Sequence, residues 1–368
     1  MGAKVCLNMI VKDEAPIIGR CLEATDGHVD AWVILDTGSL DDTPALIAAH
    51  FAARGIPGLL VHGHFGDFAH ARNRALDAAR ESGLDFDYLL FLDADSELRV
   101  DDPTWRQWLT EPAYTLRVRN TTMRYDEVRL LRRDQVARYH GVTHERLELG
   151  AVTASELGTV WYTNHADGSG QAGGPQRDIA LLRQALAEDP DNPRYVFALA
   201  QALREAGELM AAIDTYTHRA ILGGWDEEVW YCHYQIATLS EQLGLPEPVV
   251  VHAYLTAWQH RSTRAEPLVA LARYYREHGG RHALAELFAA AATTIPRPDD
   301  QLFVDEATYD WRAEDEYAMA AYWRGRHVES ALACRALLAG PRLPADQRDR
   351  INANLQYALD AGGRPTEA

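Results

Sequence analysis

A run of four apolar residues followed by two aspartates constrains this chain more than any other feature. Leu89 to Leu92 are apolar, and Asp93 and Asp95 follow with one alanine between them. A short apolar run of this kind predicts a strand buried on both faces, as in a parallel sheet. Ligands of open α/β sheets bind outside the carboxyl ends of the strands. Two carboxylates at such an end can hold a divalent cation, and that cation can clamp a diphosphate.

Composition limits the partners that this chain can have. Its 368 residues predict two or three domains at ~150 residues each. With 54 acidic and 36 basic residues the net charge is −18, which repels a phosphate backbone and makes a nucleic-acid partner unlikely. The small basic cluster of Arg129, Arg132 and Arg133 is interpreted as a solvated strand face.

Cysteine usage and the absence of long apolar runs favour a cytoplasmic protein. The cysteines at 6, 21, 232 and 334 show neither metal-binding nor disulfide spacing, so we expect reduced packing residues. The first strand begins at once, without a charged leader, and no apolar run approaches the ~20 residues of a membrane span.

The first half of the chain alternates strand and helix patterns, which predicts βαβ units and a doubly wound sheet over residues 1–166. Strands are expected at 5–11, 31–36, 59–64 and 88–92. Helices are expected at 15–24, at 68–81, and from a cap at 41–44 to residue 54. Further, mixed strands are expected at 114–119, 128–132 and 160–163.

The second half, residues 176–368, contains only amphipathic helix patterns. Glycines interrupt it at 207, 244, 279 and 325, with separations of 37, 35 and 46 residues. These approach the ~34-residue tetratricopeptide period. Two repeats fit the pattern best: Leu199, Ala200, Leu203, Gly207, Ala212 and Tyr216; and Leu271, Ala272, Tyr275, Gly279, Phe288, Ala291 and Pro296. The alternative is a helical domain without repeat geometry.

Residues 167–175 separate the two halves and are rich in glycine. They are expected to form a flexible linker. The alternative is a mobile loop that closes over a bound nucleotide.

Four motifs at strand ends and a helix start make the first half similar to a known family. They are Asn8–Glu14, Asp36–Thr43, Asp67–Asn73 and Phe91–Asp95, the last of which has the DXD form. Over roughly residues 4–165 the chain resembles the inverting glycosyltransferases of family 2, which have the GT-A fold. Its union with tetratricopeptide repeats is similar to a bacterial subgroup that includes enzymes glycosylating peptides and proteins.

The resemblance implies six nucleotide-binding residues: Val11, Glu14, Asp36, Arg72, Asp93 and His144. The last of them, His144, precedes the candidate general base in the chain. Asp36 would contact the nucleoside, or else support the turn that follows it. Backbone groups at Val11 and Glu14 would touch the base, although Glu14 could simply favour the next helix. Arg72 would lie by the nucleotide, with an exposed helix arginine as the alternative. Asp93 would face the ribose.

The resemblance also implies a metal at Asp95. A Mg²⁺ or Mn²⁺ ion there would stabilise the departing diphosphate. His165 ends the last predicted strand, where enzymes of this fold often place a third ligand, although a lone histidine is more commonly structural.

An inverting transfer is a single displacement, so it needs one general base beside the acceptor. Glu145 is the candidate, because it matches the acidic residue that the family places on the acceptor side of the sugar. His144 would bind the diphosphate or orient Glu145. The rival bases are Asp126 and Glu127, and a structural His-Glu pair in a loop is the remaining alternative.

The sequence therefore predicts a metal-dependent inverting glycosyltransferase that uses a UDP-sugar. The repeats are expected to present a peptide or protein acceptor, or to mediate self-association into a homodimer. One alternative acceptor is a small metabolite or an envelope glycan precursor. The alternative from another class is a non-catalytic repeat scaffold with a degenerate sugar-nucleotide domain.

Overall fold

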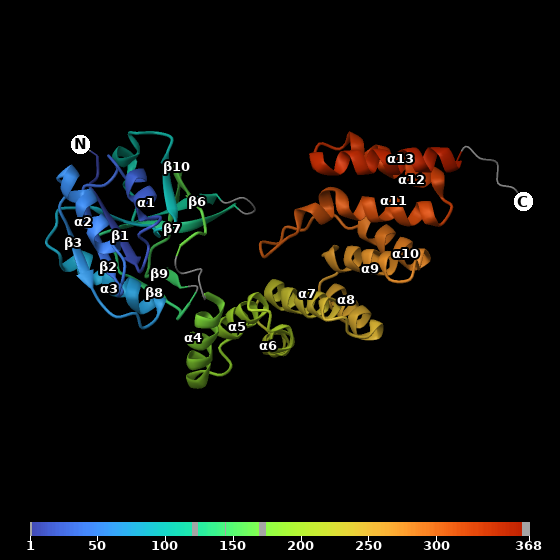
Figure 1. Cartoon of the computed structure of the whole chain (residues 1–368), viewed down its shortest axis with the longest axis horizontal. Helices are drawn as coiled ribbons and strands as arrows, with labels where there is room; N and C mark the ends of the chain where they lie inside the picture. The colour runs from blue at the N-terminus through green and yellow to red at the C-terminus, as the bar shows by residue number, and fades with distance from the viewer. Residues whose placement is uncertain (1, 120–123, 144, 169–173, 363–368) are drawn as a thin grey trace, which may run out of the picture. The chain divides into compact units, whose positions relative to one another are not determined.

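The computed structural model describes residues 2–119, 124–143, 145–168 and 174–362. The chain divides into two compact units, Met1–Ala206 and Gly207–Ala368 (Figure 1). Most of the predicted linker, residues 169–173, lies outside the described residues.

The first unit contains an eight-stranded mixed sheet with the order β3-β2-β1-β4-β7-β6-β10-β5. Strands β3, β2, β1 and β4 are parallel, β7 runs antiparallel to β4 and to β6, and β10 pairs with β6 in parallel and with β5 in antiparallel. The strands are β1 (Val5–Val11), β2 (Ala31–Asp36), β3 (Gly58–His62), β4 (Tyr88–Phe91), β5 (Ser96–Val100), β6 (Ala113–Arg119), β7 (Arg124–Arg132) and β10 (Ser155–Asn164). A separate antiparallel pair is formed by β8 (Ala137–His140) and β9 (Arg146–Leu149).

Helices cover both faces of the sheet, as the βαβ rhythm predicts. Alternate residues of β1 point to opposite faces. Leu7 joins the core that contains Ile18 of α1 (Ile18–Ala24) and Phe51 of α2 (Thr43–Arg54). Cys6 joins the opposite core, which contains Leu76 of α3 (Phe68–Glu81) and residues of the β8–β9 pair. A short 3₁₀ helix, η1, spans Trp105–Trp108.

The predicted strands and helices of this unit agree with the structure apart from their ends. The first helix is shorter than expected, because residues 15–17 form a turn in which the Glu14 carbonyl accepts from the backbone N–H groups of Ile17 and Ile18. Strands β5, β8 and β9 were not predicted, because each is short and interrupted by charged side chains, so none contains a continuous apolar run.

Every remaining secondary-structure element of the described chain is a helix (Figure 1). In the first unit these are α4 (Gly174–Glu188) and α5 (Pro193–Glu205). In the second they are α6 (Leu209–Leu222), α7 (Asp226–Gln242), α8 (Glu247–His260), α9 (Glu266–Glu277), α10 (His282–Thr293), η3 (Thr308–Arg312), α11 (Ala313–Trp323), α12 (His327–Ala339), η4 (Ala345–Gln347) and α13 (Arg348–Gly362).

The predicted glycines separate successive helices. Gly207, Gly244, Gly279 and Gly325 all have a positive φ, between 65° and 84°. Glycine reaches this left-handed conformation without a steric penalty, so it ends one helix and lets the chain turn into the next.

Most of the apolar repeat positions are buried, as the tetratricopeptide pattern requires. Leu199, Leu203, Tyr216, Leu271 and Tyr275 all belong to the buried core. Ala291 is exposed, and its neighbour at position 292 is buried instead. The chain is therefore a GT-A, Rossmann-like domain followed by an all-α tetratricopeptide-like domain.

Two composition-based expectations can be compared with the structure. All four cysteines are buried and unpaired, as expected for packing residues. Among the described residues no helix combines the length and the apolar character that a membrane span requires.

Candidate active site

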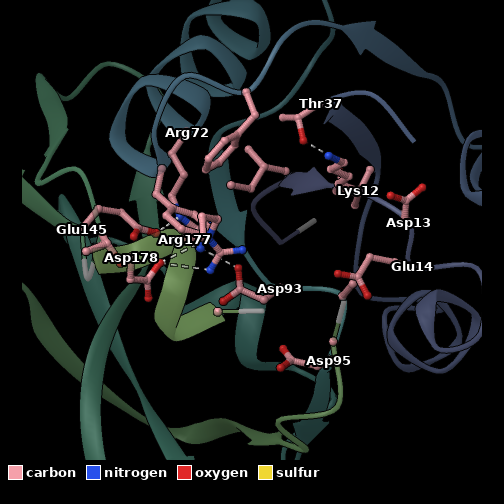
Figure 2. A pocket seen from close by; sticks show the side chains of 18 of the residues that line it. Lys12, Asp13, Glu14, Thr37, Arg72, Asp93, Asp95, Glu145, Arg177 and Asp178 are labelled. Carbon is pink, nitrogen blue, oxygen red and sulfur yellow. Dashed lines mark hydrogen bonds and ion pairs between the residues drawn. The ribbon is translucent and has the colours of Figure 1, made fainter. Parts of the chain in front are cut away.

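A cavity of about 1020 Å³ opens at the carboxyl ends of β1 and β4. Its lining comes from the segment after β1, the segment after β4, the start of α3, the loop at Thr143 and Glu145, and the first turn of α4 (Figure 2). Strand order brings these segments together, because β1 and β4 are adjacent and parallel. A cavity of the described structure thus lies at the edge of the sheet where the sequence predicts the site.

Asp93 is held by two arginines from different elements. Arg72 of α3 donates from Nη2 to Oδ1 at 2.6 Å, and Arg129 of β7 donates from Nη1 to Oδ2 at 3.2 Å. Burial opposes the charge on Asp93, but the two guanidinium groups together hold the pKa of its carboxyl well below the usual range. Asp93 is therefore a fixed anion.

Arg72 also connects Asp93 to Glu145. Its Nε donates to Oε1 of Glu145, while Nη2 remains on Asp93. The side chains of Arg72 and Glu145 are only 13% and 11% exposed, so this ion pair is largely shielded from solvent. One arginine thus fixes two carboxylates of the cavity relative to each other.

Asp95 has the opposite environment. Burial and the nearby carboxylates of Asp93, Glu14 and Asp167 raise the pKa of Asp95 to about 6. Gly168 lies against the same place, since a Cβ there would be 3.5 Å from Oε1 of Glu14 and 3.7 Å from Cβ of Asp95. Figure 2 shows Asp93, Asp95 and Glu14 around one part of the cavity.

The donor set around Asp95 suits a hard divalent cation that is also held by its substrate. No group of three or more His, Cys, Asp or Glu side chains in the described part of the chain is arranged to hold a metal alone. Mg²⁺ and Mn²⁺ sites commonly use one or two carboxylates, with phosphate oxygens and water at the other positions. The carboxylate crowding that raises the pKa of Asp95 is what a bound cation would relieve.

His165 contacts Asp95 with its backbone and not with its imidazole ring. Its N–H donates to the Asp95 carbonyl at 3.1 Å, whereas Nε2 lies 3.0 Å from Oε2 of Glu97. The residue is not part of the cavity lining. A metal-binding role would require the imidazole to leave Glu97, and it remains a prediction.

The other predicted nucleotide-binding residues are only partly in the cavity. Val11 lines it, and its carbonyl accepts from the N–H and the hydroxyl of Thr37 at 3.0 and 3.1 Å. Asp36 is buried and is not part of the cavity lining, and it accepts from the Ser39 N–H at 3.1 Å. This contact supports the turn, which was the alternative interpretation. His144 lies outside the described residues.

The rival bases are not part of the cavity lining. Asp126 is exposed and accepts from Nε of Arg117 at 3.4 Å. Glu127 accepts from Nε of Arg129 at 2.9 Å and from the Tyr162 hydroxyl at 2.7 Å. Neither residue is part of the lining, which leaves Glu145 as the acidic candidate of that group.

Sequence reasoning missed two arginines of the site. The interpretation of Arg129 as a solvated strand residue is wrong, because it is 11% exposed and bound to Asp93. Arg177 of α4 lines the cavity together with Asp178. The only available signal for Arg177 was its place directly after the glycine-rich segment that follows the sheet.

Comparison with known proteins agrees with this architecture. Residues 6–107 match the family described as glycosyl transferase family 2. A TPR repeat-containing protein of Synechococcus elongatus is 30% identical over 311 residues, which cover 75% of this chain and 72% of that protein.

Solved structures of repeat proteins show weaker similarity. MamA is 16% identical with a TM-score of 0.35, and the match covers 52% of this chain and 84% of that one. BtubC from P. vanneervenii is 13% identical with a TM-score of 0.40, over 52% and 83% of the two chains.

The fold and the family match together define a glycosyltransferase-type domain joined to helical repeats. The chain belongs to the same family as the TPR repeat-containing protein of Synechococcus elongatus, and its first part contains the segment that matches glycosyl transferase family 2.

Proposed function

We propose that this glycosyltransferase moves a sugar from a UDP-sugar to a peptide or protein acceptor, with inversion and with the help of Mn²⁺ or Mg²⁺. The proposed metal dependence is supported by the environment of Asp95. This residue lines the cavity, and burial and neighbouring carboxylates raise the pKa of its carboxyl to about 6. Such a group is poorly placed for a metal-free role beside an anionic diphosphate.

The charge of the cavity supports the same proposal. Its described lining contains seven carboxylate side chains and three cationic ones, and Arg72 is already shared between two of the carboxylates. A diphosphate placed there without a counter-ion would meet net repulsion. A divalent cation bound at Asp95 supplies the charge that stabilises the departing diphosphate.

Glu145 is the proposed general base. Arg72 binds its Oε1, which orients the carboxylate, while Oε2 has no hydrogen bond to any other described residue. That oxygen is therefore available to accept the proton of an incoming acceptor hydroxyl or amine. Because the chemistry is one displacement at the anomeric carbon, one such base is sufficient.

The repeats are the proposed acceptor platform. Helical repeat arrays form extended surfaces that suit an extended peptide. The net charge of −18 favours a neutral or basic acceptor over a polyanion. Trp225 and Trp323 of the second unit are 50% and 63% exposed, which provides apolar contact area for such a chain.

The test is UDP release from a panel of UDP-sugars by the full-length protein. The expected result is slow Mn²⁺-dependent hydrolysis of one donor that chelation abolishes and that Asp95→Asn removes. Asp126→Asn, an exposed change outside the cavity lining, is the matched control and should retain the activity. If no UDP-sugar is hydrolysed with any metal, the result would contradict the proposed enzyme and favour a non-catalytic repeat scaffold.

A further inference from the structure

A second charged pair lines the cavity from α4, and the reaction proposed above gives it no role. Nε and Nη2 of Arg177 each lie 3.2 Å from Oδ1 of Asp178, and the two side chains are 34% and 17% exposed. Both residues line the cavity. Figure 2 shows the pair on the side of the cavity where Glu145 lies, away from Lys12 and Glu14.

The guanidinium group of Arg177 is fixed by an aromatic ring. Its Cζ lies 4.8 Å from the centroid of Phe68, and the Phe68 ring meets Phe65 edge-on at 5.0 Å. The Phe68 N–H donates to the Val142 carbonyl at 3.2 Å, three residues before Glu145. Arg177 therefore belongs to the same wall as the proposed base, with its donors held in fixed directions.

The hydrogen-bonding character of the pair suits a neutral polyhydroxyl ligand better than a phosphate. The positive charge of Arg177 is balanced by Asp178, as that of Arg72 is balanced by its own carboxylates. A sugar hydroxyl both donates and accepts, so it needs donors and acceptors side by side. Oδ2 of Asp178 has no hydrogen bond within the described part of the chain, and it can accept from such a hydroxyl.

We infer that Arg177 and Asp178 bind hydroxyl groups of the transferred sugar and thereby determine which UDP-sugar is accepted. The inference rests on the proposed function, in which the sugar lies between the diphosphate at Asp95 and the base at Glu145. Both residues lie outside the segment that matches the family 2 model, residues 6–107. The specificity of the reaction is thus assigned to the first helix after the sheet.

The test compares UDP with UDP-glucose, UDP-galactose and UDP-N-acetylglucosamine on the full-length protein in Mn²⁺, by calorimetry. The wild type should bind one UDP-sugar more tightly than UDP. Arg177→Ala and Asp178→Asn should each lower the affinity for that UDP-sugar by about tenfold, which is the loss expected for one hydrogen bond to a charged group. The affinity for UDP should change by less than about twofold. Arg177→Lys should recover part of the loss, because it keeps a donor but not the planar fork.

The matched control is Arg183→Ala, an exposed arginine of the same helix that is not part of the cavity lining. It should bind all four ligands as the wild type does, and melting temperatures should verify that every variant is folded. An equal loss for UDP and for the UDP-sugar would mean that the pair contacts the diphosphate, and it would overturn the inference. So would variants that bind the preferred sugar normally, or a wild type that binds every UDP-sugar no better than UDP. A wild type that binds neither UDP nor any UDP-sugar would overturn the proposed function itself, and the inference with it.

Discussion

At the scale of single residues, the two aspartates of the Asp93-Ala94-Asp95 motif have opposite environments and therefore opposite expected mutational effects. Two arginines stabilise the charge of Asp93, whereas burial and nearby carboxylates disfavour the charge of Asp95. Asp95→Asn should leave the melting temperature unchanged or raise it. It should also weaken Mn²⁺-dependent UDP binding by more than ~100-fold, since even outer contacts of a metal site cost 10–100-fold.

Asp93→Asn is the comparison for that variant. It leaves Arg72 and Arg129 without their shared anion, so it should lower the melting temperature. Thermal denaturation and UDP titration of both variants check the pair of expectations. If Asp95→Asn were the more destabilising of the two, the assignment of roles within the motif would be wrong.

Glu145 gives a second prediction at this scale. Glu145→Gln keeps the size of the side chain but removes the proton acceptor, so transfer should fall by ~100-fold or more while UDP affinity stays within about threefold. Initial rates and calorimetry separate the two quantities. Transfer at the wild-type rate would place the base elsewhere, whereas Asp126→Asn, outside the cavity lining, should leave both quantities unchanged.

At the scale of elements, helices α4 and α5 belong with the transferase unit. Arg177 contacts Phe68, and Nε of Arg194 lies 3.8 Å from the place of a Cβ on Gly141. A fragment of residues 1–206 should bind UDP and its preferred UDP-sugar as the full chain does. A fragment of residues 1–173 should retain UDP binding but lose about tenfold or more of its affinity for the sugar.

Calorimetry on the two fragments, with the full-length protein as reference, measures this difference. Equal affinity of both fragments for the UDP-sugar would show that α4 contributes nothing to the donor site. In neither fragment is acceptor transfer expected at the full-length rate, because the repeats are absent.

Features of the fold that depend on neighbouring residues in the chain could be predicted from the sequence, whereas contacts between distant residues could not. Strand ends carry local signals, so β1, β2 and α3 were placed at their observed bounds, and the left-handed glycines marked the helix ends. Arg129, which binds Asp93, is 36 positions away from it in the chain, and Arg177, which contacts Phe68, is 109 positions away. Contacts of that range depend on strand order and helix placement, which no local pattern in the sequence specifies.

At the scale of the whole molecule, the cavity and the repeat core belong to different units. Arg264 is fully buried in the second unit, where it pairs with Glu266 at 2.7 Å and Asp300 at 3.2 Å and lies 3.6 Å from the Trp230 ring centroid. Arg264→Ala should destabilise this unit by about 3–5 kcal/mol, because it leaves the buried carboxylate of Glu266 without its cation. Asp300, in contrast, keeps its ion pair with Arg261. UDP affinity should stay within about twofold, since the described cavity lining lies in the first unit.

Urea denaturation and UDP titration of the same variant check both expectations. Arg324→Ala is the matched control, because Arg324 forms an exposed ion pair with Glu286 at 3.3 Å and should cost less than ~1 kcal/mol. Loss of UDP binding in Arg264→Ala would contradict the independence of the donor site from the repeat core.

In the reaction that we propose, this chain binds a uridine diphosphate donor through a metal at Asp95. Calorimetric titration of the full-length protein with UDP, in Mn²⁺ and again after chelation with EDTA, tests it most directly. We expect one saturable site whose affinity falls by at least ~100-fold on chelation, which corresponds to roughly 2.8 kcal/mol or more. UDP binding that is indifferent to chelation, or no binding at all, would contradict it.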